Sequence, residues 1–398
     1  MRLVVPFGTR PEIIKLAPVV AELRRRGHDV WCVATGQHDL PSMSSQFFDE
    51  LGLVPDEVFE LPPDPEARLG ALMAQATTCM GSRRRAGVDL ALLLGDTFTV
   101  PVFALAARRS QVPVAHVEAG LRSMNPTSME EVNRRVGAAC CSLHFAPTEL
   151  AARFLLAEGV APERVRVVGN PVIDALRAVG AEPRPAGERA GVLVTAHRAT
   201  NVDDPDRLRS LVDMVVELGR RLPPVTFPVH PRTADRLRAA GLDGALERAD
   251  GVRAVAPLPY RELLDVLSRS LVAVTDSGGV QEEAAWLRVP VVVLRRSTPR
   301  WEGVVAGSTV LVGVDAPAAL RAALAFAEPA EQERVGSLPC PYGDGTTAAR
   351  IADVLEEPAT ARLLEIGEPD YRSHLPDAVA AAARPDGRAT APSAVPGS

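Results

Sequence analysis

The sequence predicts an α/β protein with two doubly wound, Rossmann-like domains. Short apolar runs rich in β-branched residues alternate with segments of helical periodicity in residues 1–170, and the same alternation restarts in residues 171–355. A stretch rich in helix and strand breakers, Ala181–Gly187, is suited to a linker. A chain of 398 residues is also too long for one ordinary hydrophobic core. We therefore expect two domains with a ligand-binding cleft between them.

The first domain, residues 1–170, is expected to hold a mostly parallel sheet. Its strands are predicted at Arg2–Phe7, Asp29–Thr35, Asp89–Leu94, Val114–Val117 and Leu143–Pro147. An amphipathic helix is predicted at Pro11–Arg26, directly after the first strand. Strands that alternate with helices in this order favour right-handed parallel connections.

The second domain, residues 171–355, repeats this pattern. Its strands are predicted at Gly191–Ala196, Val225–Val229, Val252–Ala256, Leu271–Thr275, Val289–Leu294 and Thr309–Val314, and helices at Pro205–Leu222 and Tyr260–Arg269. Residues 369–398, rich in Ala, Pro, Arg, Gly and Ser, are expected to form a disordered tail.

Bulk composition narrows the function classes. A net charge of -6 argues against a nucleic-acid binder. The N-terminus has no secretory signal pattern, and no apolar run reaches membrane-spanning length, so we expect a cytoplasmic protein with no membrane partner. The five cysteines have no C-x-x-C spacing, which suggests neither a disulfide framework nor a zinc site.

Lys15 is the only lysine in the chain and follows the first predicted strand in the run Gly8–Lys15. A strand that leads through Gly-Thr-Arg-Pro into a helix places cationic side chains and helix N–H groups where phosphates bind. An ammonium differs from the guanidinium groups used elsewhere because it is a compact charge with a tunable pKa. This run therefore predicts a phosphorylated ligand.

Acidic side chains at strand ends are the clearest catalytic candidates. Asp96 ends the predicted strand Asp89–Leu94, and Glu118 follows Val114–Val117. Both should open onto the carboxyl edge of the sheet, where a desolvated cleft can separate the pKa values of an acid and a base. Asp96 could alternatively cap a helix. Glu130 and Glu131 open a predicted helix, where negative charge is favoured without any catalytic role.

The second half supplies groups suited to a nucleoside diphosphate. His197 and His230 each end a predicted strand beside a basic residue, which suits a pyrophosphate. The run Ser277-Gly278-Gly279 lies between a predicted strand and a helix, so backbone N–H groups can approach phosphate oxygens, and Glu283 could bind ribose hydroxyls. No Walker loop occurs and no G-x-G-x-x-G follows the first strand, which disfavours ATP and NAD.

Taken together, these segments resemble the non-hydrolysing bacterial UDP-N-acetylglucosamine 2-epimerases, in the same order and at similar spacing. The shared motifs are G-T-R-P-E-x-x-K at Gly8–Lys15, T-G-Q-H at Thr35–His38, G-D-T at Gly95–Thr97, H-V-E-A-G-L-R at His116–Arg122, E-E-x-N-R at Glu130–Arg134, G-N-x-V-I-D at Gly169–Asp174, V-T-x-H-R at Val194–Arg198 and T-D-S-G-G-x-Q-E-E at Thr275–Glu283.

The resemblance implies a GT-B-like fold whose two domains close over a UDP-N-acetylhexosamine, usually as a homodimer, with a possible helix at residues 356–368 crossing back to the first domain. It implies reversible C2 epimerisation by elimination of UDP and its re-addition through a 2-acetamidoglucal, with no metal or other cofactor. The residues implied to take part in acid–base catalysis are Asp96, Glu118 and Glu130. Those implied to hold UDP and its departing pyrophosphate are Arg10, Lys15, Arg134, His197, His230, Ser277, Gly278, Gly279, Glu283 and Arg300.

Three other functions stay open. A hydrolysing 2-epimerase would release UDP and N-acetylmannosamine. A GT-B glycosyltransferase would need an acceptor groove rather than three clustered carboxylates. A non-catalytic UDP-sugar-binding protein would not exchange the C2 proton with solvent.

Overall fold

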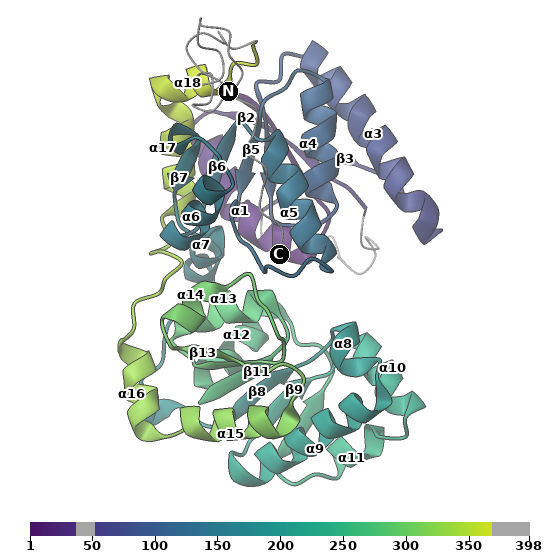
Figure 1. Ribbon diagram of the computed structural model, residues 1–398, viewed down its shortest axis with the longest axis vertical. Helices are drawn as coiled ribbons and strands as arrows, with labels where there is room; N and C mark the ends of the chain where they lie inside the picture. The colour runs from purple at the N-terminus through teal and green to yellow at the C-terminus, as the bar shows by residue number, and fades with distance from the viewer. Residues whose placement is uncertain (37–51, 368–398) are drawn as a thin grey trace, which may run out of the picture. The chain divides into compact units, whose positions relative to one another are not determined.

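The computed structural model describes residues 1–36 and 52–367, which form two parallel sheets flanked by helices (Figure 1). The predicted α/β class with two doubly wound sheets is confirmed. Gln37 and His38 of the T-G-Q-H motif and the expected tail at 369–398 lie outside the described residues. No helix in the described part of the chain has the length and apolar character needed to cross a membrane.

The first sheet has the strand order β3-β2-β1-β4-β5-β6-β7, and its neighbouring strands are all parallel. Its strands are β1 (Arg2–Phe7), β2 (Asp29–Ala34), β3 (Glu57–Val58), β4 (Leu90–Leu94), β5 (Val114–Val117), β6 (Leu143–Ala146) and β7 (Val165–Val167). The accompanying helices are α1 (Arg10–Arg25), α3 (Pro65–Arg85), α4 (Thr99–Arg109), α5 (Met129–Cys140), α6 (Glu149–Ala157) and α7 (Pro171–Ala178). The strand order runs outward in opposite directions from β1 and from β4. A ligand is therefore expected to bind at the carboxyl ends of these two strands.

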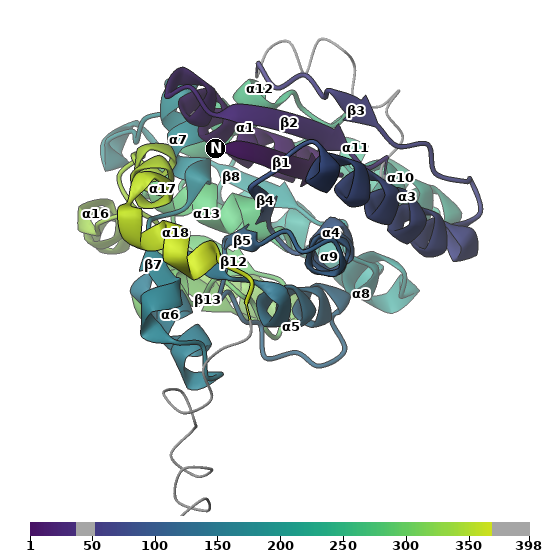
Figure 2. The same ribbon diagram turned by 90° about the horizontal axis from the view of Figure 1, so that it is seen from above.

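Side chains on the two faces of the first sheet belong to two separate hydrophobic cores. One core combines the sheet with apolar residues of α1 and of a late helix, α17 (Thr347–Glu356). The opposite core combines it with α3 and α4, and Figure 2 shows these two helices on the other side of the sheet from α17. Burial on both faces explains why β1 and β4 read as continuous apolar runs.

The second sheet has the strand order β10-β9-β8-β11-β12-β13 and is also parallel throughout. Its strands are β8 (Val192–Thr195), β9 (Val225–Pro228), β10 (Val252–Val255), β11 (Val272–Thr275), β12 (Val291–Val293) and β13 (Thr309–Leu311). The helices are α8 (Ala199–Val202), α9 (Pro205–Arg221), α10 (Pro231–Ala239), α11 (Asp243–Glu247), α12 (Tyr260–Arg269), α13 (Gly278–Leu287), α14 (Trp301–Val305), α15 (Ala316–Phe326) and α16 (Pro329–Ser337). Here the winding reverses between β8 and β11.

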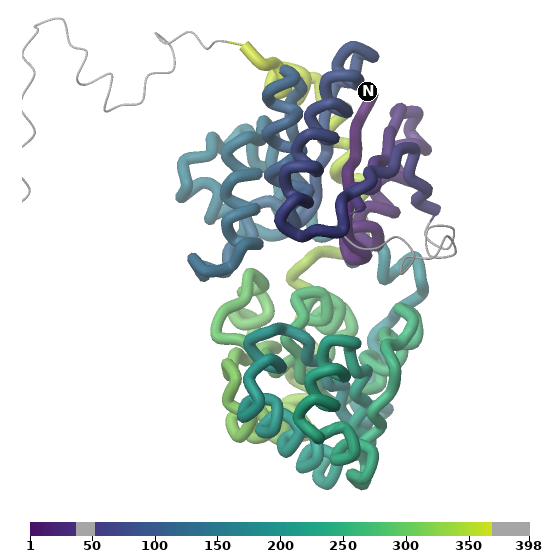
Figure 3. Tube along the Cα trace, turned by 90° about the vertical axis from the view of Figure 1, so that its right-hand side faces the viewer, coloured from purple at the N-terminus to yellow at the C-terminus, as the bar shows by residue number. Residues whose placement is uncertain are grey.

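The chain returns to the first sheet earlier than the sequence predicted. Figure 3 follows this return, and α17 already contributes Ile351 and Leu355 to the first core. The backbone N–H groups of Thr347 and Ala348 donate to Asp174 of α7, at 3.2 and 2.8 Å, which fixes the start of α17. The helix ends before Pro358, and α18 (Pro358–Leu364) follows. The observed α18 lies within the predicted helix at 356–368 and adds Leu364 to the same core, while the domain limits stay a prediction.

Gly120 is expected to be irreplaceable in the turn after β5. Its φ is +84°, and a methyl group added there would collide with the carbonyl oxygen of Ala151. We expect Gly120→Ala to lower the free energy of unfolding by about 2 kcal/mol or more, because backbone strain and a steric clash act together. Gly187→Ala is the control, since nothing lies within 4 Å of a methyl group there. Equal urea midpoints for the two variants would contradict this prediction.

Candidate active site

The candidate site is built at the carboxyl ends of the strands where both sheets reverse their winding. The first sheet supplies the segments after β1, β4 and β5, which carry Lys15, Asp96 and Glu118. The second supplies the segments after β8 and β11, which carry His197 and Ser277. Parallel strands bring their carboxyl ends to one edge, so residues distant in sequence meet there.

Lys15 is the centre of a buried polar network that joins residues of both sheets. Its Nζ donates to Glu118 Oε1 at 2.5 Å and to Glu282 Oε2 at 2.7 Å. The Asn170 side-chain amide donates to the same two carboxylates, at 2.8 and 3.1 Å. Arg300 Nε donates to Glu282 Oε1 at 2.8 Å. Two cations therefore face two carboxylates, which is the arrangement that makes buried charges tolerable.

Glu118 and Lys15 stay ionised because pairing outweighs burial. Burial alone would raise the pKa of Glu118, but the charges of Lys15 and Arg300 lower it to about 2. Burial would lower the pKa of Lys15, but Glu118 and Glu282 raise it. Glu118 also has a φ of +65°, a conformation that non-glycine residues rarely adopt. The fold thus holds this carboxylate in a strained position, as functional sites often do.

Asp96 belongs to a second ionic group beside the first. Its carboxylate is paired with Arg134 Nη1, and Arg134 Nη2 donates to Glu131 Oε2 at 2.9 Å. The preceding turn is close to Glu118, since a methyl group added to Gly95 would lie 3.8 Å from Glu118 Oε2. The side chain of Asp96 is 26% exposed, so it can reach a ligand while Arg134 holds it.

Glu130 lies at the start of α5 and points toward the second sheet. It accepts a hydrogen bond from Ser128 Oγ at 2.6 Å, and its carboxylate is 3.6 Å from Arg198 Nη1. Its side chain is 41% exposed, in contrast to the buried Glu131. The adjacent acids therefore differ in environment: Glu131 holds Arg134, and Glu130 is open to a ligand.

His197 is held at the end of β8 by the buried Asp276. The imidazole Nδ1 is 3.1 Å from Asp276 Oδ1, and the backbone N–H groups of His197 and Arg198 donate to Asp276 Oδ2 at 2.9 and 2.8 Å. The ring centroid of His230 lies 5.4 Å from that of His197. The structure thus brings together the two histidines that the sequence singled out.

The Ser277-Gly278-Gly279 run begins α13 as predicted, with Ser277 Oγ accepting a hydrogen bond from Val280 N at 3.5 Å. Gly278 and Gly279 form its first turn, where N–H groups lack helical partners. Arg10 is exposed at the first position of α1, and Glu283 is buried on α13. The described residues contain no cluster of three or more His, Cys, Asp or Glu side chains able to hold a metal ion.

Glu283 should make stability depend on pH. Burial raises its pKa from 4.5 to about 7, and the charge of Glu282 adds to the shift. A carboxyl group with a raised folded-state pKa gives stability that is complete below pH 4.5 and lost as the pH rises through about 7. In urea unfolding, the stability of wild type relative to Glu283→Gln should fall by about 3 kcal/mol between pH 4.5 and 8. The exposed Glu262→Gln is the control, and identical pH profiles for both variants would contradict the assignment.

Several residues of the site were not among those predicted from the sequence. Glu282 is adjacent to the predicted Glu283. Which of the two faces Lys15 depends on how α13 is rotated about its axis, and the sequence does not give that rotation. Asn170 looks like a helix N-cap, which it also is, since its side chain accepts from Val172 N. Asp276 precedes the predicted Ser277 and reads as the end of a strand. All three residues lie within the shared motifs at Gly169–Asp174 and Thr275–Glu283, and these motifs were the signal that could have pointed to them.

Comparison with known proteins identifies the family. The model of the UDP-N-acetylglucosamine 2-epimerase family matches residues 21–356. The chain belongs to this family. A UDP-N-acetylglucosamine 2-epimerase of Methanocaldococcus jannaschii is 34% identical over 378 residues, which cover 89% of this chain and 99% of the relative. The UDP-2,3-diacetamido-2,3-dideoxy-D-glucuronate 2-epimerase of Pseudomonas aeruginosa is also 34% identical, over 364 residues, 89% of this chain and 99% of that one.

Solved structures of family members have the same fold. The M. jannaschii enzyme in complex with UDP-GlcNAc and UDP superposes with a TM-score of 0.77 at 33% identity, covering 89% of this chain and 99% of that one. The Neisseria meningitidis enzyme bound to UDP-GlcNAc gives 0.77 at 30% identity, covering 89% and 99%. The glycosyltransferase of kitacinnamycin, at 18% identity, gives 0.58 over 91% and 98% and shows the fold alone. The GT-B-like fold and the enzyme class expected from the sequence are confirmed.

Proposed function

We propose that this enzyme interconverts UDP-N-acetylglucosamine and UDP-N-acetylmannosamine by eliminating UDP and adding it back. The observation that carries this proposal is the strained, buried Glu118, paired with Lys15 at the carboxyl edge of the first sheet. A carboxylate and cations in such close contact suit a reaction that removes a proton and expels an anionic leaving group.

The proposed first step forms 2-acetamidoglucal. A carboxylate from the group Asp96, Glu118 and Glu130 removes the C2 proton, the C1–O bond to UDP breaks, and the electron pair of the C–H bond becomes the C1–C2 double bond. In the return step, a phosphate oxygen of UDP adds to C1 and a carboxyl group delivers a proton to the opposite face of C2. The substrate gains and loses no electrons overall, so this reaction needs no redox cofactor.

The cations of the network can couple ligand binding to this chemistry. Lys15 and Arg300 hold Glu118 ionised in the structure described here. If the pyrophosphate shares these two cations, Glu118 loses part of its stabilisation and its pKa rises toward that of a useful base. His197 and the N–H groups of Gly278 and Gly279 are then placed to bind the pyrophosphate.

The test is incubation with UDP-N-acetylglucosamine in D2O, followed by NMR. We expect both UDP-linked epimers to appear with deuterium at C2. Release of N-acetylmannosamine with UDP would instead identify a hydrolysing enzyme, and binding with no exchange would identify a UDP-sugar-binding protein. The names of relatives show that substituents on the hexose vary, since the P. aeruginosa relative is named for a glucuronate. The C2 chemistry is what these names share.

A further inference from the structure

Four arginines line a hollow of about 280 Å³ at the carboxyl edge of the second sheet. Arg198 follows β8, Arg295 and Arg296 follow β12, and Arg207 lies at the start of α9. Among the described residues that line the hollow, none is acidic. Such a concentration of one charge attracts anions.

The four arginines differ in whether they form an ion pair with a carboxylate. Arg198 is 3.6 Å from Glu130, and Arg207 Nε is 3.7 Å from Asp204. Within residues 1–36 and 52–367, neither Arg295 nor Arg296 forms an ion pair. Burial lowers the pKa of Arg295 to about 10. The charges of Arg198 and Arg300 add to this shift, and those of Glu130 and Asp276 only partly oppose it. A partly buried cation beside other cations is unfavourable unless an anion joins it.

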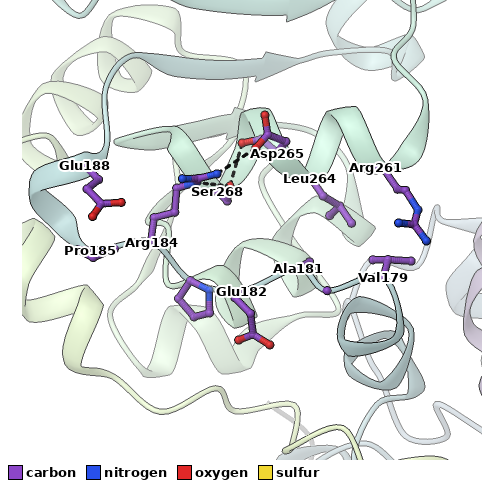
Figure 4. A pocket seen from close by; sticks show the side chains of 12 residues that line it. Val179, Ala181, Glu182, Arg184, Pro185, Glu188, Arg261, Leu264, Asp265 and Ser268 are labelled. Atoms are coloured by element: carbon purple, nitrogen blue, oxygen red, sulfur yellow. Dashed lines mark hydrogen bonds and ion pairs between the residues drawn. The ribbon is translucent and has the colours of Figure 1, made fainter.

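Another surface hollow shows the contrast. It lies between α12 and the segment 179–188 (Figure 4) and has a volume of about 460 Å³. Its Arg184 is bound by Asp265 at 3.2 Å, and Glu182 and Glu188 also line it. Acidic side chains therefore line this hollow beside its arginines, unlike the hollow around Arg295 and Arg296.

The arginine-lined hollow adjoins Glu130, which the proposed function places beside the hexose. Strands β8, β11 and β12 are neighbours, so the ends of β8 and β12 flank Ser277, which follows β11. Arg198 both lines the hollow and approaches Glu130, one of the proposed acid–base residues. The donors assigned to the pyrophosphate, at Gly278 and Gly279, do not line the hollow, which leaves its arginines for a second anion.

We infer that the preferred substrate carries a carboxylate on its hexose, as UDP-linked hexosaminuronates do, and that Arg295 and Arg296 bind it. This inference rests on the proposed function, because it defines the substrate of the same site. Guanidinium groups suit the task because they form paired, charge-assisted hydrogen bonds with carboxylates.

The experiment compares two substrates that differ only at C6. We would measure kcat/KM for UDP-N-acetylglucosamine and for UDP-N-acetylglucosaminuronate, following C2 deuterium exchange. Wild type should prefer the uronate by about tenfold or more, and Arg296→Gln should reduce that preference by about tenfold, the effect of losing a charged hydrogen bond. Arg296 is exposed, so the substitution should leave folding intact. Arg209→Gln, on the exposed face of α9, should keep the wild-type preference.

Each other outcome is decisive. Equal kcat/KM for both substrates, or exchange with UDP-N-acetylglucosamine alone, would overturn the inference and leave the proposed function intact. Absence of exchange with either substrate would overturn the proposed function itself. If the uronate is not turned over, but inorganic phosphate inhibits wild type and not Arg296→Gln, the hollow binds a free anion and the inference about the substrate is wrong.

Discussion

Glu118→Gln is expected to lower kcat for C2 epimerisation by about 10³-fold, within the range typical of removing a general acid–base group. The glutamine amide can still occupy the strained position after β5, where φ is +65°, but it cannot accept the C2 proton. The readout is the rate of deuterium incorporation at C2, measured by NMR at saturating substrate. Because the substitution nearly preserves volume, circular dichroism should be unchanged.

Glu282→Gln is the matched comparison, because Glu282 is the other carboxylate that binds Lys15. If Glu118 reacts with the substrate directly, Glu282→Gln should change KM through Lys15 and Arg300 more than it changes kcat. Equal loss of kcat in both variants would mean that Glu118 acts only by positioning Lys15. Wild-type exchange in Glu118→Gln would exclude it as an acid–base residue.

Periodicity predicted most of the fold because both sheets are parallel and buried on both faces. Such strands are continuous apolar runs, and their order along the chain gives the βαβ connections. The edge strand β3, only Glu57–Val58, was missed because a two-residue segment is too short to carry a periodic signal. The three-residue strand β7 was missed for a similar reason.

Glu118 was predictable from its position at the end of a strand, Lys15 from the strand-to-helix run that contains it, and Arg300 only from the family resemblance. Lys15, Glu118 and Arg300 were predicted, and the structure joins them in one network. Glu282 was not predicted, because a choice between adjacent helical residues depends on how α13 is rotated against the rest of the protein. Asn170 was missed for a related reason, since its amide reaches both carboxylates only through tertiary packing.

Lys15→Met is expected to lower the free energy of unfolding by about 3–5 kcal/mol at neutral pH, the cost of leaving buried charges without their partner. Wild-type Glu118 has its pKa lowered from 4.5 to about 2, so its pairing stabilises the protein above pH 4.5 and is lost as the pH falls through about 2. Without the ammonium, the buried carboxylates should have raised pKa values. The variant should therefore be least stable at neutral pH and recover as acid protonates them, which urea unfolding at pH 7.5 and 5 would show.

The double variant Lys15→Met/Glu118→Gln separates charge from packing. It removes the ammonium together with one of its two carboxylates, so it should be more stable at neutral pH than Lys15→Met alone, although its activity stays lost. The stability of the double variant should also depend less on pH than that of Lys15→Met, because it contains one fewer buried acid. A loss of only about 1 kcal/mol in Lys15→Met, as for a surface ion pair, would mean that water reaches Lys15 and that the network is not the closed one described here.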